Sequence, residues 1–263
     1  MTIYMSIEKR FVVTILAGGE GKRMYTDSSV QKPKVLYGFL GEPMILRILK
    51  IVVRLQPDKI FIVVGKHKNQ IQNEIESFNI DTSSIEYVDQ PEPKGTGDAI
   101  KCCLPYYKTD DRILILNGDM PCINHDLLEN LLISTSRQSC VIVSAKVENP
   151  FGYGRIEYNA QNEFRRIIEE RDCTFEQKKI DRINAGIYLV TGSILASCVS
   201  SITNENSQKE YYLTDVFVLH KKYSTIPIMI YEISKRDSWM IQGVNTIDEL
   251  RKAELSVSYH SHI

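Results

Sequence analysis

Short apolar runs that alternate with longer tracts of helical spacing constrain most strongly how this chain can fold. Within residues 11–147 the runs are FVVTIL, KIFIVVG, IEYVDQ, RILILNGD and CVIVSAKV. Between them, PMILRILKIVVRL and GDAIKCCLPYY carry apolar residues at helical intervals. Continuous apolar strands separated by helices are typical of a mostly parallel sheet that is covered on both faces. The pattern therefore predicts an α/β fold.

After about Asn149 the pattern changes. Shorter strands with alternating polar residues follow, GRIEYN and FRRIIEERD, then INAGIYLVTG and a closing helix at TIDELRKAEL. The chain of 263 residues is long enough to bury a core without disulfides or metals, and no Pro/Ser-rich linker or repeat divides it. We therefore expect a single domain over 1–263, with one part at about 11–150 and a mixed part at about 151–250.

Composition excludes several classes of protein. Lys+Arg 32 balance Asp+Glu 33, so there is no global basic footprint for nucleic acid. The six cysteines have no C-x-x-C spacing, which argues against zinc and favours reduced thiols. No apolar run approaches the roughly 20 residues of a membrane helix, and the segment MTIYMSIEKR lacks an apolar signal region. We expect no nucleic-acid partner, no membrane contact and a cytoplasmic location.

A glycine-rich turn follows the first apolar run. Glycines let a backbone approach phosphate oxygens closely, and nearby cations would balance the charge of an anion. The turn matches neither the Walker pattern nor the dinucleotide fingerprint, whose third glycine is replaced by Met24. An ordinary glycine turn with solvated cations is the alternative. The residues in question are Gly18, Gly19, Gly21, Lys22, Arg23, Lys32 and Lys34.

The full string L-A-G-G-x-G-x-R-M, followed by K-P-K, resembles the signature of the sugar-nucleotide nucleotidylyltransferases. The resemblance implies their nucleotide-diphospho-sugar transferase fold, which is a Rossmann-like, mostly parallel mixed sheet flanked by helices. It also implies that Arg23 and Lys34 are catalytic residues that balance the charge of a triphosphate. Guanidinium can contact two oxygens at once, whereas ammonium acts as a point charge. By the same resemblance the loop around the phosphates contains Leu16, Ala17, Gly18, Gly19 and Gly21.

The tract QPEPKGTGDAI follows the strand IEYVD. Taken alone, it indicates a helix start with Thr96 as the capping residue. The resemblance instead implies that Gln90, Gly95 and Thr96 read the edge of a pyrimidine base. An amide side chain both donates and accepts hydrogen bonds, as a uracil edge requires.

Two distant polar residues are candidates for a metal site. Asp119 follows the strand RILILN, where open α/β sheets place ligand crevices, and Gly118 before it is a nucleotide-binding candidate. The resemblance implies that Asn245, in the Gly-Val-Asn segment at 243–245, is the second ligand of Mg²⁺. One carboxylate and one amide suffice because Mg²⁺ keeps phosphate and water ligands. Without the resemblance, Asn245 would be assigned to the first turn of a helix.

Three later tracts narrow the resemblance. FGYGRIEY, INAGIYLV and EYYLTDVF resemble, in order and spacing, the uridylyltransferase domain of the bacterial N-acetylglucosamine-1-phosphate uridyltransferases. Each residue taken alone could be structural, as a core aromatic, a solvated charge or a turn residue. The resemblance implies that a sugar site is lined by Gly154, Glu169, Asn184, Tyr212 and Thr214.

The chain also departs from these enzymes. Residues 25–31 form a longer stretch, nearer in length to that of thymidylyl- and guanylyl-transferring relatives. Pro93 stands where a glutamine is usual, and Ala185 where threonine is frequent. No hexapeptide repeats follow the closing helix, so we expect no β-helix acetyltransferase domain. The oligomeric state stays open.

The expected activity is transfer of a uridylyl group from UTP to N-acetylglucosamine 1-phosphate, with release of pyrophosphate and with Mg²⁺ as cofactor. The attacking phosphate is already ionised near neutral pH, so no general base or covalent nucleophile is needed. Two alternatives remain open. One is a nucleotidylyltransferase for another base or sugar, such as a glucose-1-phosphate thymidylyltransferase. The other is a catalytically silent regulatory subunit that binds a nucleotide sugar.

Overall fold

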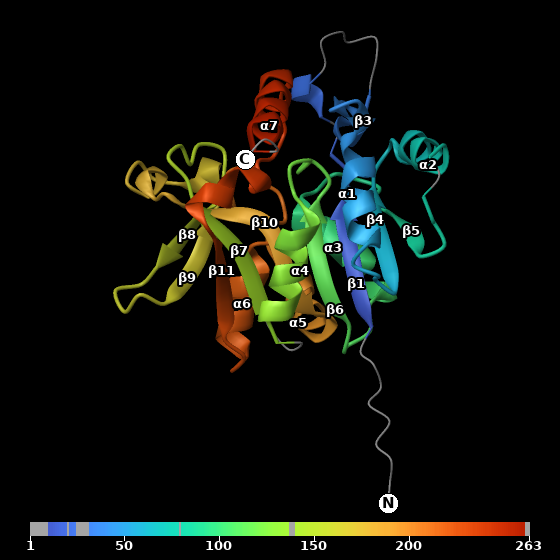
Figure 1. Cartoon of the computed structure of the whole chain (residues 1–263). Coiled ribbons are helices and arrows are strands. Elements are labelled where there is room, and N and C mark those ends of the chain that lie inside the picture. Colours follow the sequence, from blue (N-terminus) through green and yellow to red (C-terminus); the bar gives the residue numbers. More distant parts are fainter. Residues whose placement is uncertain (1–9, 20, 25–31, 79, 137–139, 261–263) are drawn as a thin grey trace, which may run out of the picture.

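The computed structural model describes residues 10–19, 21–24, 32–78, 80–136 and 140–260. Its main feature is a nine-stranded sheet in which seven strands lie in the order β11-β7-β10-β6-β1-β4-β5 (Figure 1). β10 is antiparallel to both β6 and β7, whereas the other pairs in this row are parallel. The bounds are β1 (Phe11–Leu16), β4 (Lys59–Val64), β5 (Ile85–Asp89), β6 (Arg112–Asn117), β7 (Cys140–Lys146), β10 (Arg182–Thr191) and β11 (Ile228–Ile233). The predicted mostly parallel mixed sheet is confirmed.

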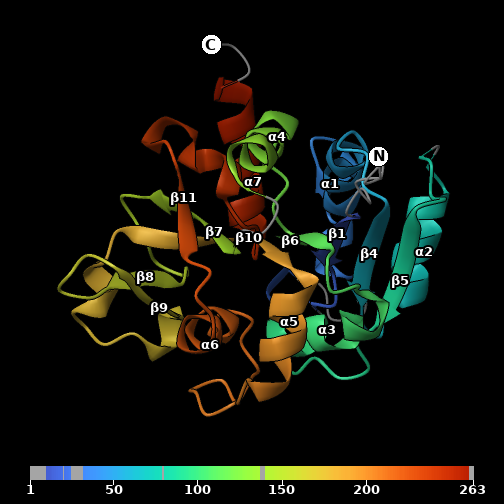
Figure 2. The same cartoon turned by 90° about the horizontal axis from the view of Figure 1, so that it is seen from below.

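Helices cover both faces of the sheet (Figure 2). Alternate residues of β1 point to opposite faces, so Val13 and Ile15 join one core while Val12 joins the other. The first core contains α1 (Met44–Val53), α2 (Lys68–Glu76) and α4 (His125–Ser134). The second contains α3 (Thr96–Cys103), α5 (Gly192–Cys198) and α6 (Asp215–Tyr223). Because both faces are buried, the central strands consist of continuous apolar runs.

A hairpin joins the sheet beside β10. It consists of β8 (Arg155–Tyr158) and β9 (Phe164–Ile168), and β8 pairs with β10. The sequence indicated a strand through FRRIIEERD, but β9 ends at Ile168 and a 3₁₀ turn follows at Glu170–Asp172. The turn starts where the Glu170 carboxylate pairs with the buried guanidinium of Arg155.

The helix α7 (Ile247–His260) stands apart from these layers, beside the short strands β2 (Gly38–Phe39) and β3 (Glu42–Pro43) (Figure 1). A third core joins it to the rest, with Met24, Phe39 and Ala253 fully buried. The Trp239 and His260 rings stack with centroids 4.5 Å apart, which fixes the end of the helix. This packing brings the segment before α7 to the sheet, where Val244 N–H donates to the Asp119 carbonyl at 2.9 Å.

The carboxyl ends of β1, β4, β5 and β6 meet at one edge of the sheet. The chain runs outward from β1 through β4 to β5 and then returns to β6 on the other side of β1. A crevice forms where the strand order reverses in this way. All six cysteines are free, and no described helix is both long enough and apolar enough to cross a bilayer.

Candidate active site

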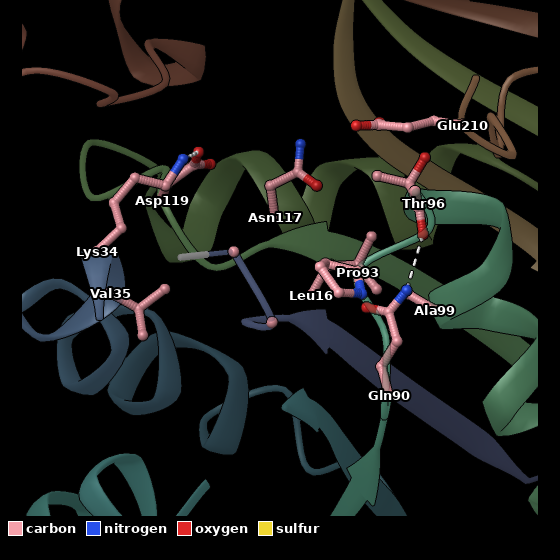
Figure 3. A pocket seen from close by; sticks show the side chains of 13 residues that line it. Leu16, Lys34, Val35, Gln90, Pro93, Thr96, Ala99, Asn117, Asp119 and Glu210 are labelled. Atoms are coloured by element: carbon pink, nitrogen blue, oxygen red, sulfur yellow. Dashed lines mark hydrogen bonds and ion pairs between the residues drawn. The ribbon is translucent and has the colours of Figure 1, made fainter. Parts of the chain in front are cut away.

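Two adjoining cavities occupy this edge. The larger has a volume of about 570 Å³ and the smaller about 280 Å³. Figure 3 shows Asn117 between Lys34 and Asp119 on one side and Gln90 and Thr96 on the other. The cavities form one continuous cleft, because they share the residues Leu16, Thr96, Asn117, Asp119 and Glu210.

The glycine-rich turn forms one wall of the larger cavity, which Gly18 and Gly19 line. Gly21 has φ +66°, and a Cβ there would lie 2.7 Å from the Cβ of Lys34, so only glycine fits. Gly118 N–H donates to the Leu16 carbonyl at 2.9 Å, which holds the two strand ends together. Ala17, Gly21 and Gly118 shape the backbone but do not line either cavity.

The predicted charged residues meet at the junction of the cavities. The Lys34 ammonium contacts the Asp119 carboxylate and, at 3.0 Å, the Asn245 side-chain oxygen. Arg23 Nη2 reaches the same Asn245 oxygen at 3.2 Å. Asn245 is held by its own N–H, which donates to Glu249 Oε2 at 2.6 Å. A carboxylate oxygen and an amide oxygen thus converge on the Lys34 ammonium, and this pair of oxygen donors fits Mg²⁺.

The base-reading candidates lie at the opposite end of the larger cavity. Gln90 is 6% exposed, and its Nε2 donates to Gly95 O at 3.0 Å and to Asp98 Oδ2 at 2.9 Å. Gly95 has φ +109°, and a Cβ there would lie 2.5 Å from Tyr211 O. Helix α3 begins at Thr96, whose hydroxyl accepts from Leu213 N–H at 3.1 Å. The interpretation of Thr96 as a helix cap is therefore wrong, because its hydroxyl joins the helix to a distant segment.

All five sugar-site candidates line the smaller cavity. Asn184 N–H donates to Gly154 O at 2.8 Å, and Thr214 Oγ1 donates to Glu169 Oε1 at 3.1 Å. The Asn184 amide is oriented on both sides, since its Nδ2 donates to Tyr188 OH at 2.6 Å and its oxygen accepts from Gly186 N–H at 3.2 Å. The side chains are thus ordered by one another before any ligand binds.

The electrostatics of the two cavities differ. No described Lys or Arg lines the smaller cavity, whereas Lys34 lines the larger. Burial, together with the charge of Asp215, raises the pKa of Glu169. Burial likewise raises the pKa of Tyr212 to about 12, so its hydroxyl stays a hydrogen-bond donor at neutral pH. The smaller cavity therefore suits a ligand rich in hydroxyl and amide groups rather than a second polyanion.

Sequence reasoning missed several lining residues. Asn117 closes β6 in register with Leu16, and this position at a strand end was a usable signal. Gln208 and Glu210 lie in a segment without helix or strand, and no local pattern indicated them. Pro93 lines the larger cavity and Ala185 the smaller, so both departures from the resembling enzymes lie in the cleft. Residues 25–31, the lengthened stretch, are outside the described residues.

The chain is similar to known proteins over nearly its whole length. It is 40% identical over 95% of its residues to a probable UDP-N-acetylglucosamine pyrophosphorylase of Acanthamoeba polyphaga mimivirus, of which it covers 97%. It is 36% identical over 90% of its residues to the bifunctional protein GlmU of Trichodesmium erythraeum, but spans 55% of that protein. A UDP-glucose pyrophosphorylase crystallised with UDP-glucose has the same fold, with a TM-score of 0.73 at 17% identity, and the match covers 95% of this chain and 99% of that one.

A family model agrees with this similarity. The model of the MobA-like NTP transferase domain matches residues 13–179, which include the glycine-rich turn, Asp119 and the β8–β9 hairpin. The resemblance indicated by the motifs is confirmed, and the chain belongs to the MobA-like NTP transferase family, as an enzyme of the sugar-nucleotide nucleotidyltransferase group.

Proposed function

We propose that this protein transfers a uridylyl group from UTP to N-acetylglucosamine 1-phosphate and releases pyrophosphate. The observation that carries the proposal is the continuous cleft. In it, Lys34 and Asp119 lie between the end that contains Gln90 and a smaller cavity that no described Lys or Arg lines. The relative that is 40% identical and bears the name of this activity supports the choice of base and sugar. The six free cysteines support a reducing, cytoplasmic location.

The residues of the cleft have distinct roles in this reaction. Lys34 and Arg23 neutralise the departing pyrophosphate, and the glycine-rich turn offers backbone N–H groups to the phosphate oxygens. The attacking phosphate oxygen is already ionised, so catalysis depends on charge and in-line placement. Asp119 and Asn245 would hold Mg²⁺, which would supply positive charge to the phosphates in the cleft.

Base and sugar are read at opposite ends of the cleft. The Gln90 amide nitrogen is already used by Gly95 and Asp98, which leaves its oxygen to accept the uracil N3–H. At the other end, Asn184, Thr214 and Tyr212 offer amide and hydroxyl groups to an N-acetylated hexose. A site built for the acetamido group rejects a sugar without it, because buried polar groups are then left unpaired.

The test is pyrophosphate release by the purified protein with Mg²⁺, measured for UTP or dTTP paired with N-acetylglucosamine 1-phosphate or glucose 1-phosphate. We expect the highest kcat/KM for UTP with N-acetylglucosamine 1-phosphate. A preference for dTTP with glucose 1-phosphate would identify a thymidylyltransferase instead. Binding of UTP without turnover of any pair would identify a regulatory subunit.

A further inference from the structure

Arg155 is the bulkiest of the fully buried side chains in the described part of the protein, at 1% exposure. It lies where three strands meet. In register, Arg155 of β8 is opposite Ile183 of β10 and Ile168 of β9. A charged residue at such a junction requires a physical reason, because burial of a guanidinium removes its hydration.

The next row across the same strands contains three of the predicted sugar-binding residues. Because both pairings are antiparallel, one step from Arg155 brings Gly154 opposite Asn184 and Glu169. The hydrogen bond from Asn184 N–H to Gly154 O, at 2.8 Å, confirms this register. A Cβ on Gly154 would lie 3.4 Å from Glu169 Oε2 and 3.5 Å from Asn184 Cβ. Arg155 thus lies directly behind this row.

Its contacts join two of the three strands, β8 and the end of β9. Nη2 donates to Glu170 Oε2 at 2.6 Å, and Nη1 donates to the Tyr153 carbonyl. Glu170 Oε2 also accepts from Gly152 N–H at 3.1 Å. The pair therefore joins the segment 152–154 to the residue that follows Glu169. Gly152, Tyr153 and Gly154 all line the smaller cavity.

Stability is a weak explanation for this pair. Desolvation offsets most of the attraction within a buried ion pair, and apolar replacements of both partners are often neutral for stability. The Arg155 Nε also has no hydrogen-bond partner among the described residues, so the guanidinium is incompletely satisfied. What the pair does provide is a fixed spacing between β8 and the end of β9.

We propose that Arg155 and Glu170 are positioning residues that set the affinity for the sugar 1-phosphate. They do so by holding Gly154, and with it the hydrogen-bonded Asn184, at a fixed spacing from Glu169. The proposal rests on the function proposed above, because it takes the smaller cavity as the sugar site. Neither Arg155 nor Glu170 is among the described residues that line the larger cavity, so we expect the affinity for UTP to be independent of the pair.

The test replaces both charged residues, so that an effect on the position of the sugar site can be distinguished from an effect on the stability of the fold. In the double variant with Arg155→Met and Glu170→Met, we expect a melting temperature close to that of the wild-type protein. The KM for N-acetylglucosamine 1-phosphate should rise about tenfold, the effect of losing one to two net hydrogen bonds, while the KM for UTP stays within about twofold. Arg155→Lys should give the same split, because a lysine keeps the charge but lacks the fork that reaches two partners.

The matched control is a second ion pair on the same hairpin. Arg166 Nε lies 3.0 Å from Glu157 Oε2, and Arg166 is 45% exposed. The double variant with Arg166→Met and Glu157→Met should leave both KM values unchanged. A wild-type KM for the sugar phosphate in the Arg155/Glu170 variants, or an equal rise in both KM values, would overturn the proposal.

The proposed function and the positioning role fail in different ways. If the wild-type protein uses another sugar 1-phosphate, the specific function fails, and the same KM comparison with that substrate decides the positioning role. If the double variant does not fold, the two KM values are compared in Arg155→Lys alone. An unchanged sugar KM in Arg155→Lys would then refute the role of the pair.

Discussion

The two ends of the cleft are built differently. The end proposed to bind the nucleotide consists of loops that leave successive parallel strands, with glycine backbone and the cation Lys34. The end proposed to bind the sugar is built from antiparallel strands and the segment before α6. Its amides, hydroxyls and a carboxylate already hydrogen-bond to one another. A phosphate ligand is recognised chiefly by charge and exposed N–H groups, whereas a neutral sugar requires oriented partners. The contrast predicts that the two ends fail separately when mutated.

The largest effect is expected at Asp119, which lines both cavities and therefore belongs to both ends of the cleft. Asp119→Asn should lower kcat at least about 10²-fold at saturating Mg²⁺, because it removes charge from the point that both phosphates share. Pyrophosphate release measures this. Asp126→Asn is the matched control, since Asp126 is 82% exposed on α4. Near-normal turnover of Asp119→Asn would remove this residue from the site.

A pair of variants separates the two ends. Asn184→Ala should raise the KM for the sugar 1-phosphate about 10- to 100-fold, because it unpairs Tyr188 OH and Gly186 N–H along with the ligand. Gln90→Ala should raise the KM for UTP instead. Steady-state kinetics with each substrate varied in turn tests both variants. If either variant raises both KM values equally, the two ends are coupled and the comparison fails.

The two ends of the cleft should also differ in how strongly they discriminate between related substrates. A methyl group is worth only about 1–3 kcal/mol, so UTP should be preferred over dTTP less strongly than N-acetylglucosamine 1-phosphate over glucose 1-phosphate. Measurements of kcat/KM for each pair decide the order, with dUTP separating the missing ribose hydroxyl from the methyl group. A strong preference for dTTP would indicate that the longer stretch at residues 25–31 was the better guide.

The smallest expected effect is on the stability of the protein, and it concerns Asp215, whose charge acts on Glu169 at the sugar end. Burial and the nearby Asp172 raise the pKa of Asp215 to about 6. Because this pKa is raised, ionisation of Asp215 is less favourable in the folded state than in the unfolded state. The free energy of unfolding therefore falls as the pH rises from about 4 to about 6. After discounting for partial exposure, Asp215→Asn should therefore stabilise the protein by about 1 kcal/mol at pH 8, with the gain vanishing below pH 4.

Urea unfolding at pH 4 and pH 8 measures this difference. Asp248→Asn is the matched control, because Asp248 also lies in the first turn of a helix but is 83% exposed, so its replacement should bring no gain in stability at pH 8. An equal effect of Asp215→Asn at both pH values would mean that Asp215 ionises as it does in water.

The sequence predicted the nucleotide end better than the sugar end. The strands β1, β4 and β6 are buried on both faces and have unbroken apolar sequences, and their loops follow at once in the chain. Motif resemblance placed Gly154, Glu169 and Asn184 together, but nothing local indicated that Arg155 lies behind them. Taken alone, the local tract indicated that Thr96 is a helix cap, whereas its hydroxyl contacts Leu213 N–H, which is 117 residues away. Contacts of such separation depend on packing that no local pattern encodes.

The antiparallel strand β10 has a consequence for synthesis of the chain. It lies between β6 and β7, so the edge of β6 has no neighbour until residues 182–191 have left the ribosome. Translation adds roughly 5–20 residues per second, which leaves this apolar edge unpaired for several seconds. An open edge of this kind invites pairing with other nascent chains. Folding yield in the cell should therefore depend more on the rate at which β8 to β10 are made than on the stability of the finished protein.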